Sequence, residues 1–177
     1  MYKLLKQIPL EKLDNLQNEK KQSLFEKAAE SRGYSPRKPT REEKAGYHVS
    51  HILTGKSSLG KKVCIKIDLK KNKNKKKFED WLWIEFKNSR GKPGWIHGDA
   101  HFLVFERSED FIFVNRKELV EWLSSANKIR YDLPFVGLAK QAKYRIYKRA
   151  NMPEEITQIA VKDIKSLKSF QIWPKNA

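Results

Sequence analysis

The amino-acid sequence predicts an α/β or α+β fold, with a mixed central β-sheet flanked by helices. Helical signals come first, closely spaced strand signals follow, and a further helix and more strands complete the chain. With 177 residues, 39% of them apolar and 11% aromatic, the chain can bury one core. We expect a single domain over residues 1–177, with residues 1–22 as a helical extension and residues 127–177 as strands and a short helix.

Helix signals fall in residues 9–33. Pro9 suits the first turn of a helix. Ser23 and Glu26 have the spacing of a capping box, which predicts that a second helix begins at Ser23. Gly33 is a natural stop for that helix.

Strand signals cluster in the next part of the chain, in short runs rich in β-branched and aromatic residues. The predicted strands there are Tyr47–Leu53, Val63–Leu69, Trp81–Lys87, His101–Glu106 and Phe111–Val114. Later signals are a helix capped by Asn115, strands at Tyr144–Lys148 and Ile156–Val161, a short helix at Lys162–Leu167 and a final SFQIWP edge strand or tail.

The net charge of +17 predicts a polyanionic partner, because such an excess of cations repels itself. Nucleic acid is the commonest partner of this kind, and a membrane surface is the second. No apolar run approaches the roughly 18 residues of a membrane span, so we expect no membrane contact. The N-terminus is too polar for a signal peptide, and a cytoplasmic protein is expected.

A single cysteine, Cys64, excludes an internal disulfide and a cysteine-rich zinc site. It alternates with apolar residues, so we expect it to face the core and to be unreactive.

Two charges end the strand Trp81–Lys87. Strand residues alternate between faces, so Glu85 and Lys87 project on one side and the apolar residues between them on the other. A carboxylate here can hold Mg²⁺, which prefers oxygen ligands. A lysine can activate water and offset charge in the transition state of phosphodiester cleavage. The alternative is a pair of exposed residues at a strand end.

Other acids can join this pair. Asp68 lies near the end of the preceding strand, and adjacent strands would bring it beside Glu85. Glu26 or Glu30 of the helix, four residues apart on one face, would complete a metal site. The alternative for both is ordinary helix-surface charge.

Together these residues resemble the PD-(D/E)XK nuclease superfamily, over roughly residues 23–125. Its members place an acid on one core strand and a D/E-x-K triplet on the next. The resemblance implies a restriction-endonuclease-like core, a Mg²⁺ (or Mn²⁺) cofactor, and Asp68, Glu85 and Lys87 as catalytic residues. The implied metal ligands are Asp68, Glu85 and Glu30, with Glu26 as the alternative helical acid.

The stretch WLWIEFKNSRGKPGWIHGDAHFLVFE is similar to a group of uncharacterised phage and bacterial proteins. That group often carries an Asp and then a D-x-K triplet on the two preceding strands. Here those places hold Ser50 and Lys66-Ile67-Asp68, so the similarity implies an altered or inactive nuclease centre.

A loop of Gly, Pro, Arg and Lys follows the strand. Arg90 and Lys92 place charge at its tip, while Trp95 either stacks on a base or packs back over the sheet. A lysine run and a basic, tyrosine-containing segment are further candidate phosphate contacts. The residues expected to bind nucleic acid are Lys70, Lys71, Lys73, Lys75, Lys76, Lys77, Arg90, Lys92, Trp95, Arg145, Lys148 and Arg149.

Three functions remain open. The first is a Mg²⁺-dependent endonuclease that hydrolyses phosphodiester bonds of DNA. The second is a non-catalytic nucleic-acid-binding protein on a degenerate nuclease fold, and the third is a basic protein that binds an acidic protein. The oligomeric state is open, with a homodimer as one option.

Overall fold

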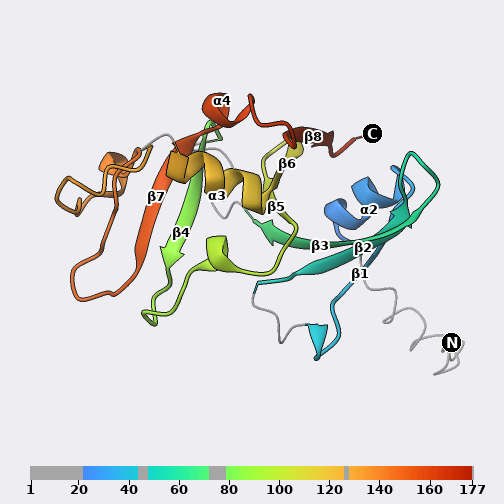
Figure 1. The fold of residues 1–177 in the computed structure, drawn as a ribbon, viewed down its shortest axis with the longest axis horizontal. Helices are drawn as coiled ribbons and strands as arrows, with labels where there is room; N and C mark the ends of the chain where they lie inside the picture. The colour runs from blue at the N-terminus through green and yellow to red at the C-terminus, as the bar shows by residue number, and fades with distance from the viewer. Residues whose placement is uncertain (1–21, 44–47, 72–78, 126–127, 177) are drawn as a thin grey trace, which may run out of the picture.

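The computed structural model is a mixed α+β fold and describes residues 22–43, 48–71, 79–125 and 128–176 (Figure 1). The predicted α+β class and mixed sheet are confirmed. The helix expected before Ser23 and the lysines from Lys73 to Lys77 lie outside the described residues.

Short helices and strands make up the described chain. The helices are α2 (Leu24–Glu30), α3 (Arg116–Ser125) and α4 (Val161–Ile164), with 3-10 turns η2 (Trp95–His97) and η3 (Ala139–Gln141). The strands are β1 (Ser35–Arg37), β2 (His51–Lys56), β3 (Lys62–Lys70), β4 (Trp81–Lys87), β5 (Phe102–Glu106), β6 (Asp110–Asn115), β7 (Glu155–Ala160) and β8 (Gln171–Pro174).

Six strands form one sheet in the order β1-β2-β3-β5-β6-β8, and β4 and β7 form a second, two-stranded sheet. The pair β3–β5 is parallel and the other pairs are antiparallel. A parallel pair needs a long crossover connection, and here the chain between β3 and β5 contains β4 and η2.

The expectation that β3 and β4 would be neighbouring strands is wrong. Both sides of β3 are occupied, by β2 and by β5, so β4 has no free edge of β3 to join. Instead β4 pairs with β7, with Leu82 opposite Ile159. Asp68 and Glu85 therefore lie on different sheets.

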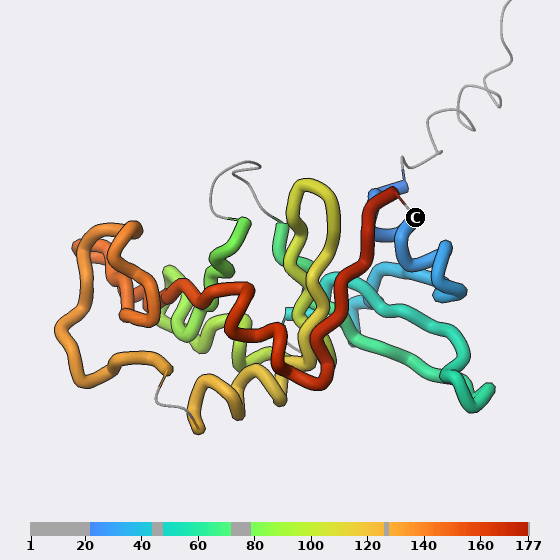
Figure 2. Tube along the Cα trace, turned by 90° about the horizontal axis from the view of Figure 1, so that it is seen from above, coloured from blue at the N-terminus to red at the C-terminus, as the bar shows by residue number. Residues whose placement is uncertain are grey.

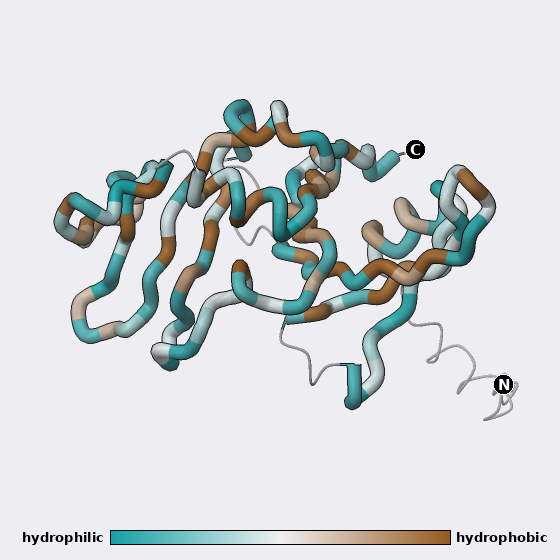
Figure 3. Tube along the Cα trace, in the orientation of Figure 1, coloured by the Kyte–Doolittle hydropathy of each residue, from teal (hydrophilic) through white to brown (hydrophobic). Residues whose placement is uncertain are grey.

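Strands β5 and β6 are the centre of the molecule, because each buries both of its faces. On one face Leu103 and Ile112 join a cluster with η2, α3, α4 and the second sheet. On the other face Val104 and Phe113 join a cluster with α2 and β8. In Figure 3 apolar residues gather on the central strands, and the outer loops mix hydrophilic with a few hydrophobic residues.

The two capping signals are confirmed. Ser23 and Glu26 form a capping box at the start of α2, and this helix buries Phe25 against the sheet. The Glu118 N–H donates to Asn115 Oδ1 at 3.1 Å, which caps α3. Apolar spacing and caps therefore place both helices.

The segment Tyr144–Lys148 does not form the strand that was expected. Tyr144 has a φ of 56°, which interrupts extended backbone, and only isolated bridges such as Tyr147–Ile156 join the segment to β7. The expected final strand is present as β8, at the edge of the large sheet.

Figures 1 and 2 show that the β1–β3 strands and residues 128–149 lie at opposite ends of the long axis. Within the described ranges, no helix is long and apolar enough to cross a membrane.

Candidate functional site

Asp68 lies on the face of β3 that points away from α2. Its neighbour Ile67 packs in the same core cluster as Phe25, and strand side chains alternate between faces. Asp68 is 5% exposed, and this burial raises the pKa of its carboxyl, although nearby Lys70 acts in the opposite direction. Lys70 Nζ lies 2.7 Å from Asp68 Oδ2, at ion-pair distance but without hydrogen-bond geometry. This carboxylate is therefore buried and incompletely hydrogen-bonded.

Ser50 stands where the narrower similarity implies an acid, and its contacts are structural. Its Oγ accepts a hydrogen bond from Leu69 N at 2.8 Å and donates to Ile67 O at 3.2 Å. These two bonds clamp the β3 backbone on either side of Asp68. An ionised carboxylate has no proton to donate to Ile67 O, so an acid could not replace this clamp.

His51 is buried on the α2 side of the sheet and is neutral. Burial, and then the charge of Lys38, lower the pKa of His51 to about 4. Lys38 Nζ lies 2.5 Å from Nε2, and Ser50 Oγ lies 3.0 Å from Nδ1. An ammonium can only donate, so Nε2 is the acceptor and Nδ1 carries the proton of the neutral ring.

The acids of α2 do not approach Asp68. Glu26 closes the capping box, and its Oε1 lies 3.8 Å from His51 Nε2 on the α2 side of the sheet. Glu30 is exposed at the end of α2. The helical acid expected in a shared metal site therefore lies across the sheet from the Asp68 carboxylate.

Glu85 and Lys87 have different partners. Glu85 Oε1 accepts a hydrogen bond from the Trp95 N–H at 3.2 Å. Lys87 Nζ donates to Glu155 Oε1 of β7 at 2.8 Å. The register of the β4–β7 pair shifts between Glu85 and Lys87, which disrupts the simple alternation that was expected to align them.

Trp95 packs back over the sheet, as one of the two sequence interpretations had it. It is 8% exposed, and its ring meets Phe105 edge-on at 6.0 Å. Gly94 allows this approach, because a Cβ there would lie 2.6 Å from the carbonyl carbon of Glu85. Trp95 has too little exposed surface to stack on a nucleic-acid base.

A chain of contacts connects part of the predicted centre. Asp68 pairs with Lys70, Lys70 Nζ lies 4.5 Å from the centroid of the Trp95 ring, and Trp95 N–H contacts Glu85. The sequence reading placed Lys70 only among the phosphate contacts. The signal that pairs it with Asp68 is the two-residue spacing, which puts both side chains on one face of a strand.

Metal ligands do not gather at this point. In the described ranges, no group of three or more His, Cys, Asp and Glu side chains could hold an ion. The residues assigned by the resemblance therefore do not fit a three-ligand Mg²⁺ site.

Some of the other predicted basic residues are exposed, and others form ion pairs or hydrogen bonds within the protein. Arg90 and Lys92 are exposed on a turn that the side chain of Asn88 holds. Arg149 pairs with Glu154 and Lys148 with Glu155, at 2.5 and 3.7 Å. Arg145 donates to the carbonyl of Pro134, and Lys71 is exposed at the end of β3.

A second basic surface was not predicted from the sequence. Lys56, Lys62 and Lys66 share one face of the β2–β3 hairpin, since Lys56 lies opposite Lys62 in the strand register. Exposed Cys64 lies on the same face, so its predicted burial is wrong. We call these three lysines the basic sheet face. Helix α2 packs on the other face. On this one Lys56, Lys62 and Cys64 are exposed, while Lys66 is half-buried beside the buried Ile52.

The surroundings of His101 confirm that this region is positive. Burial lowers the pKa of His101 first, and then Lys66, Lys117 and Arg116 lower it further. All the charged groups that shift this pKa are cations. None of the lysines of the basic sheet face forms an ion pair with a carboxylate in the part of the chain that the structure describes.

No protein-family model matches the chain, and neither a curated protein nor a solved structure is significantly similar to it. The nuclease resemblance therefore stays a hypothesis, and function must be argued from the residues themselves.

Proposed function

We propose that this protein binds nucleic acid through the phosphate backbone, and that the basic sheet face is a contact surface. The observation that carries the proposal is the set of lysines at positions 56, 62 and 66. They share one sheet face, and none of them forms an ion pair with a carboxylate of the described residues. The net charge of +17 has the same sign as this local excess.

Lysine ammonium groups on a strand suit phosphates better than bases. Each is a point charge on a flexible stem, so it can follow a backbone without reading its sequence. We therefore propose binding with little base specificity and with steep dependence on salt.

The test measures retardation of a labelled duplex and of the matching single strand at increasing salt. A triple variant, Lys56→Glu, Lys62→Glu and Lys66→Glu, reverses the charge of the basic sheet face. The control reverses the exposed Lys162, Lys165 and Lys168, which gives the same net charge elsewhere on the surface. Since each lost phosphate contact weakens binding, we expect a loss of about tenfold or more for the first variant and a much smaller loss for the control.

Two results would count against the proposal. Equal losses in both triple variants would mean that net charge alone governs binding and that the basic sheet face is not a contact surface. No retardation of either nucleic acid at low salt would remove nucleic-acid binding itself. The remaining function would then be binding to an acidic protein.

A second candidate is the Mg²⁺- or Mn²⁺-dependent endonuclease on a restriction-endonuclease-like core. The observation that favours it is the buried Asp68, whose Oδ2 accepts no hydrogen bond from a described residue and faces Lys70. Buried, perturbed carboxyls beside a lysine are common at catalytic centres. In this candidate Asp68 is the acid at the centre, and Lys70 takes the place expected of Lys87.

Cleavage assays on plasmid and single-stranded DNA with either metal test this candidate. Asp68→Asn and Lys70→Ala are expected to abolish cleavage and to leave retardation nearly unchanged, and Asp99→Asn, at an exposed position, is the control. Glu85→Ala and Lys87→Ala separate the two lysine assignments. Loss of cleavage in Lys87→Ala but not in Lys70→Ala would restore the original triplet, and normal cleavage in all four variants would exclude this site.

A further inference from the structure

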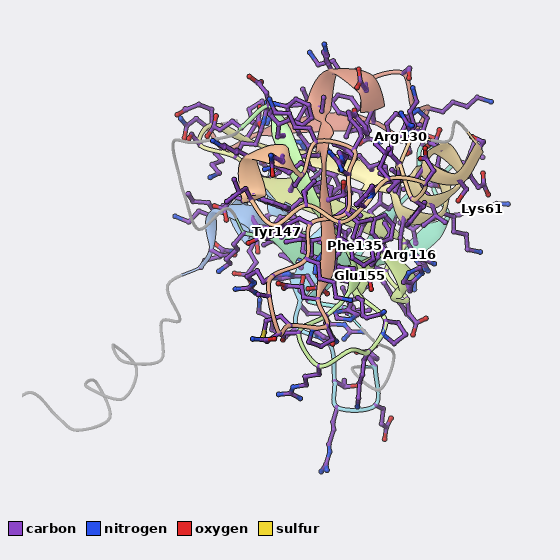
Figure 4. The ribbon with its side chains drawn as sticks, turned by 90° about the vertical axis from the view of Figure 1, so that its left-hand side faces the viewer. Lys61, Arg116, Arg130, Phe135, Tyr147 and Glu155 are labelled. Atoms are coloured by element: carbon purple, nitrogen blue, oxygen red, sulfur yellow. The ribbon has the colours of Figure 1, made fainter. Side chains whose placement is uncertain are left out.

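The segment 128–149 is the most one-sidedly charged part of the described chain. It carries seven basic residues and one acidic residue, Asp132, which Arg130 already pairs at 2.7 Å. Isolated bridges join it to the outer edge of β7, since Tyr147 bridges Ile156 on one side and Val136 on the other. Figure 4 views this end of the molecule and labels Arg130, Phe135, Tyr147 and Glu155.

Large apolar side chains are exposed within this cationic segment. Tyr131 is 64% exposed, Phe135 54% and Leu138 54%. Exposed apolar side chains that form one patch mark a contact surface. A partner for these three side chains would have to accept both rings and positive charge.

Neighbouring groups hold the two rings in place. The Tyr131 ring meets Phe86 of β4 edge-on at 6.0 Å. Lys148 Nζ lies 5.0 Å from the centroid of the Phe135 ring, and Lys148 also lies 3.7 Å from Glu155. Each ring has one supported side and remains more than half exposed, which is the geometry of a stacking surface.

Further aromatic and basic side chains continue this arrangement toward the second sheet. Tyr147 lies 6.2 Å from Trp83 between ring centroids, and Lys143 Nζ lies 4.5 Å from the centroid of the Trp81 ring. Lys143 forms no ion pair with a carboxylate among the residues that the structure describes. Ring–ring and cation–ring contacts therefore both occur where this segment meets β4.

We propose that Tyr131 and Phe135, with the cations of segment 128–149, form a platform that binds single-stranded nucleic acid. The proposal rests on nucleic-acid binding as the function, but it uses a surface at the other end of the molecule from the basic sheet face. Flat rings stack on the faces of bases, and a single strand offers these faces whereas a duplex hides them. The cations bind the phosphates between successive bases.

The charge of the segment argues for this occupant over a protein. Protein interfaces are usually depleted of lysine in their centre, whereas this segment carries four lysines, and the Nζ of one of them, Lys148, lies 5.0 Å from the centroid of the Phe135 ring. A polyanion with flat apolar groups matches both the charge and the exposed rings. A single-stranded nucleic acid has this chemistry.

The experiment measures fluorescence anisotropy of a labelled single strand of roughly 20 nucleotides and of its duplex. The variant carries Tyr131→Ala and Phe135→Ala. The control carries Leu24→Ala and Ile172→Ala, which truncate two exposed apolar side chains on α2 and β8, 50% and 42% exposed. We expect single-strand affinity to fall about tenfold or more in the platform variant, because stacking is lost, with little change for the duplex or the control.

A second variant, Tyr131→Trp and Phe135→Trp, keeps flat rings at both positions and is expected to retain single-strand binding. Equal loss for single strand and duplex, or no loss for either, would overturn the platform. Because Tyr131 and Phe135 are exposed, an unchanged unfolding midpoint is expected and checks that the variant is folded.

The outcomes separate this inference from the proposed function. If the wild-type protein binds neither nucleic acid, the proposed function fails. If it binds both and only reversal of the basic sheet face weakens binding, that function stands and the platform does not exist.

Discussion

The two ends of the molecule carry positive charge in different ways. At the β1–β3 end, the lysines of the basic sheet face form no ion pair with a described carboxylate, because Asp68 on the same face of β3 pairs with Lys70. At the end formed by residues 128–149, cations lie over aromatic rings, as Lys148 does over Phe135, and three of them also pair with acids.

This difference teaches that net charge alone does not define a nucleic-acid surface. Unpaired lysines on a strand offer long-range attraction to any phosphate backbone. Cations packed on rings combine weaker attraction with apolar area that only an unstacked base can cover. One chain therefore presents two chemistries, and the following predictions test whether the two ends are as distinct as they look.

The largest expected effect is on the free energy of unfolding, through the core packing around Phe25. Phe25→Ala removes a ring that is 1% exposed and packs on Phe111 and Phe113. We expect it to lower the free energy of unfolding by about 3–5 kcal/mol, measured by urea denaturation. Leu24→Ala, at a 50% exposed position of the same helix, is the control with a small effect.

The two ends belong to one folding unit only if they unfold together. They share β5 and β6, which bury one face toward each core cluster, so one cooperative transition is expected for the Phe25 variant. Two separated transitions would mean that the ends are independent units.

The second effect concerns pH at the β1–β3 end. The pKa of buried His51 is about 4 in the folded protein, against 6.5 for an ordinary histidine. Between these values the unfolded chain binds a proton and the folded chain does not, so stability falls as the pH falls from 6.5 to 4. The contribution of this one group is at most about 3 kcal/mol.

His51→Gln is expected to flatten this fall in the free energy of unfolding, measured between pH 7 and pH 4 by chemical denaturation. The exposed His97 of η2 supplies the control, His97→Gln. Asp68 works in the opposite sense, because its raised pKa lets the folded chain bind a proton before the unfolded chain does. An unchanged slope in the His51 variant would show that the histidine binds protons equally in the folded protein and in the unfolded chain.

The third effect is on stability and concerns the close packing of η2 on β4. In Gly94→Ala the new Cβ would lie 2.6 Å from the carbonyl carbon of Glu85 and 2.8 Å from that of Phe86, so the backbone must move. We expect a loss of about 1–3 kcal/mol in the free energy of unfolding. Gly137→Ala is the matched control, because nothing lies within 4 Å of its Cβ position. Equal stability of the two variants would mean that η2 is not held on β4.

The smallest expected effect is on the salt dependence of nucleic-acid affinity, which should differ between variants of the two ends. Lys62→Ala and Lys66→Ala should each reduce the slope of log affinity against log salt by about one or less, since each removes at most one phosphate contact. Tyr131→Ala should leave that slope unchanged, because it removes stacking and no charge. The measurement is a salt titration of single-strand binding, and a changed slope in Tyr131→Ala would erase the distinction between the ends.

Local features of the fold could be predicted from the sequence. The alternating run Trp81–Lys87 is a strand with the bounds expected, and the polar caps at Ser23 and Asn115 begin helices where expected. These signals depend on neighbours in sequence. Strand pairing does not, and nothing in the sequence of β3 states that its partner is β5 and not β4.

The candidate site shows the same limit. The sequence correctly draws attention to Asp68 but assigns its partners by chain order, so Lys87 and Glu30 were expected beside it. In the structure Lys70 lies beside Asp68 instead. Residues two apart on one strand share a face, whichever strands lie next to it. The exposed rings at Tyr131 and Phe135 were not predicted, since exposure depends on what tertiary packing leaves uncovered.

The pairing of β4 with β7 has a consequence for how the chain folds. The two strands are far apart in sequence, with Leu82 opposite Ile159, so the ribosome releases β4 long before its partner is made. Until then Leu82 and Ile84, both buried in the finished protein, stay uncovered on an unpaired strand edge. We expect this late, non-local step to slow folding and to make nascent or truncated chains prone to aggregation.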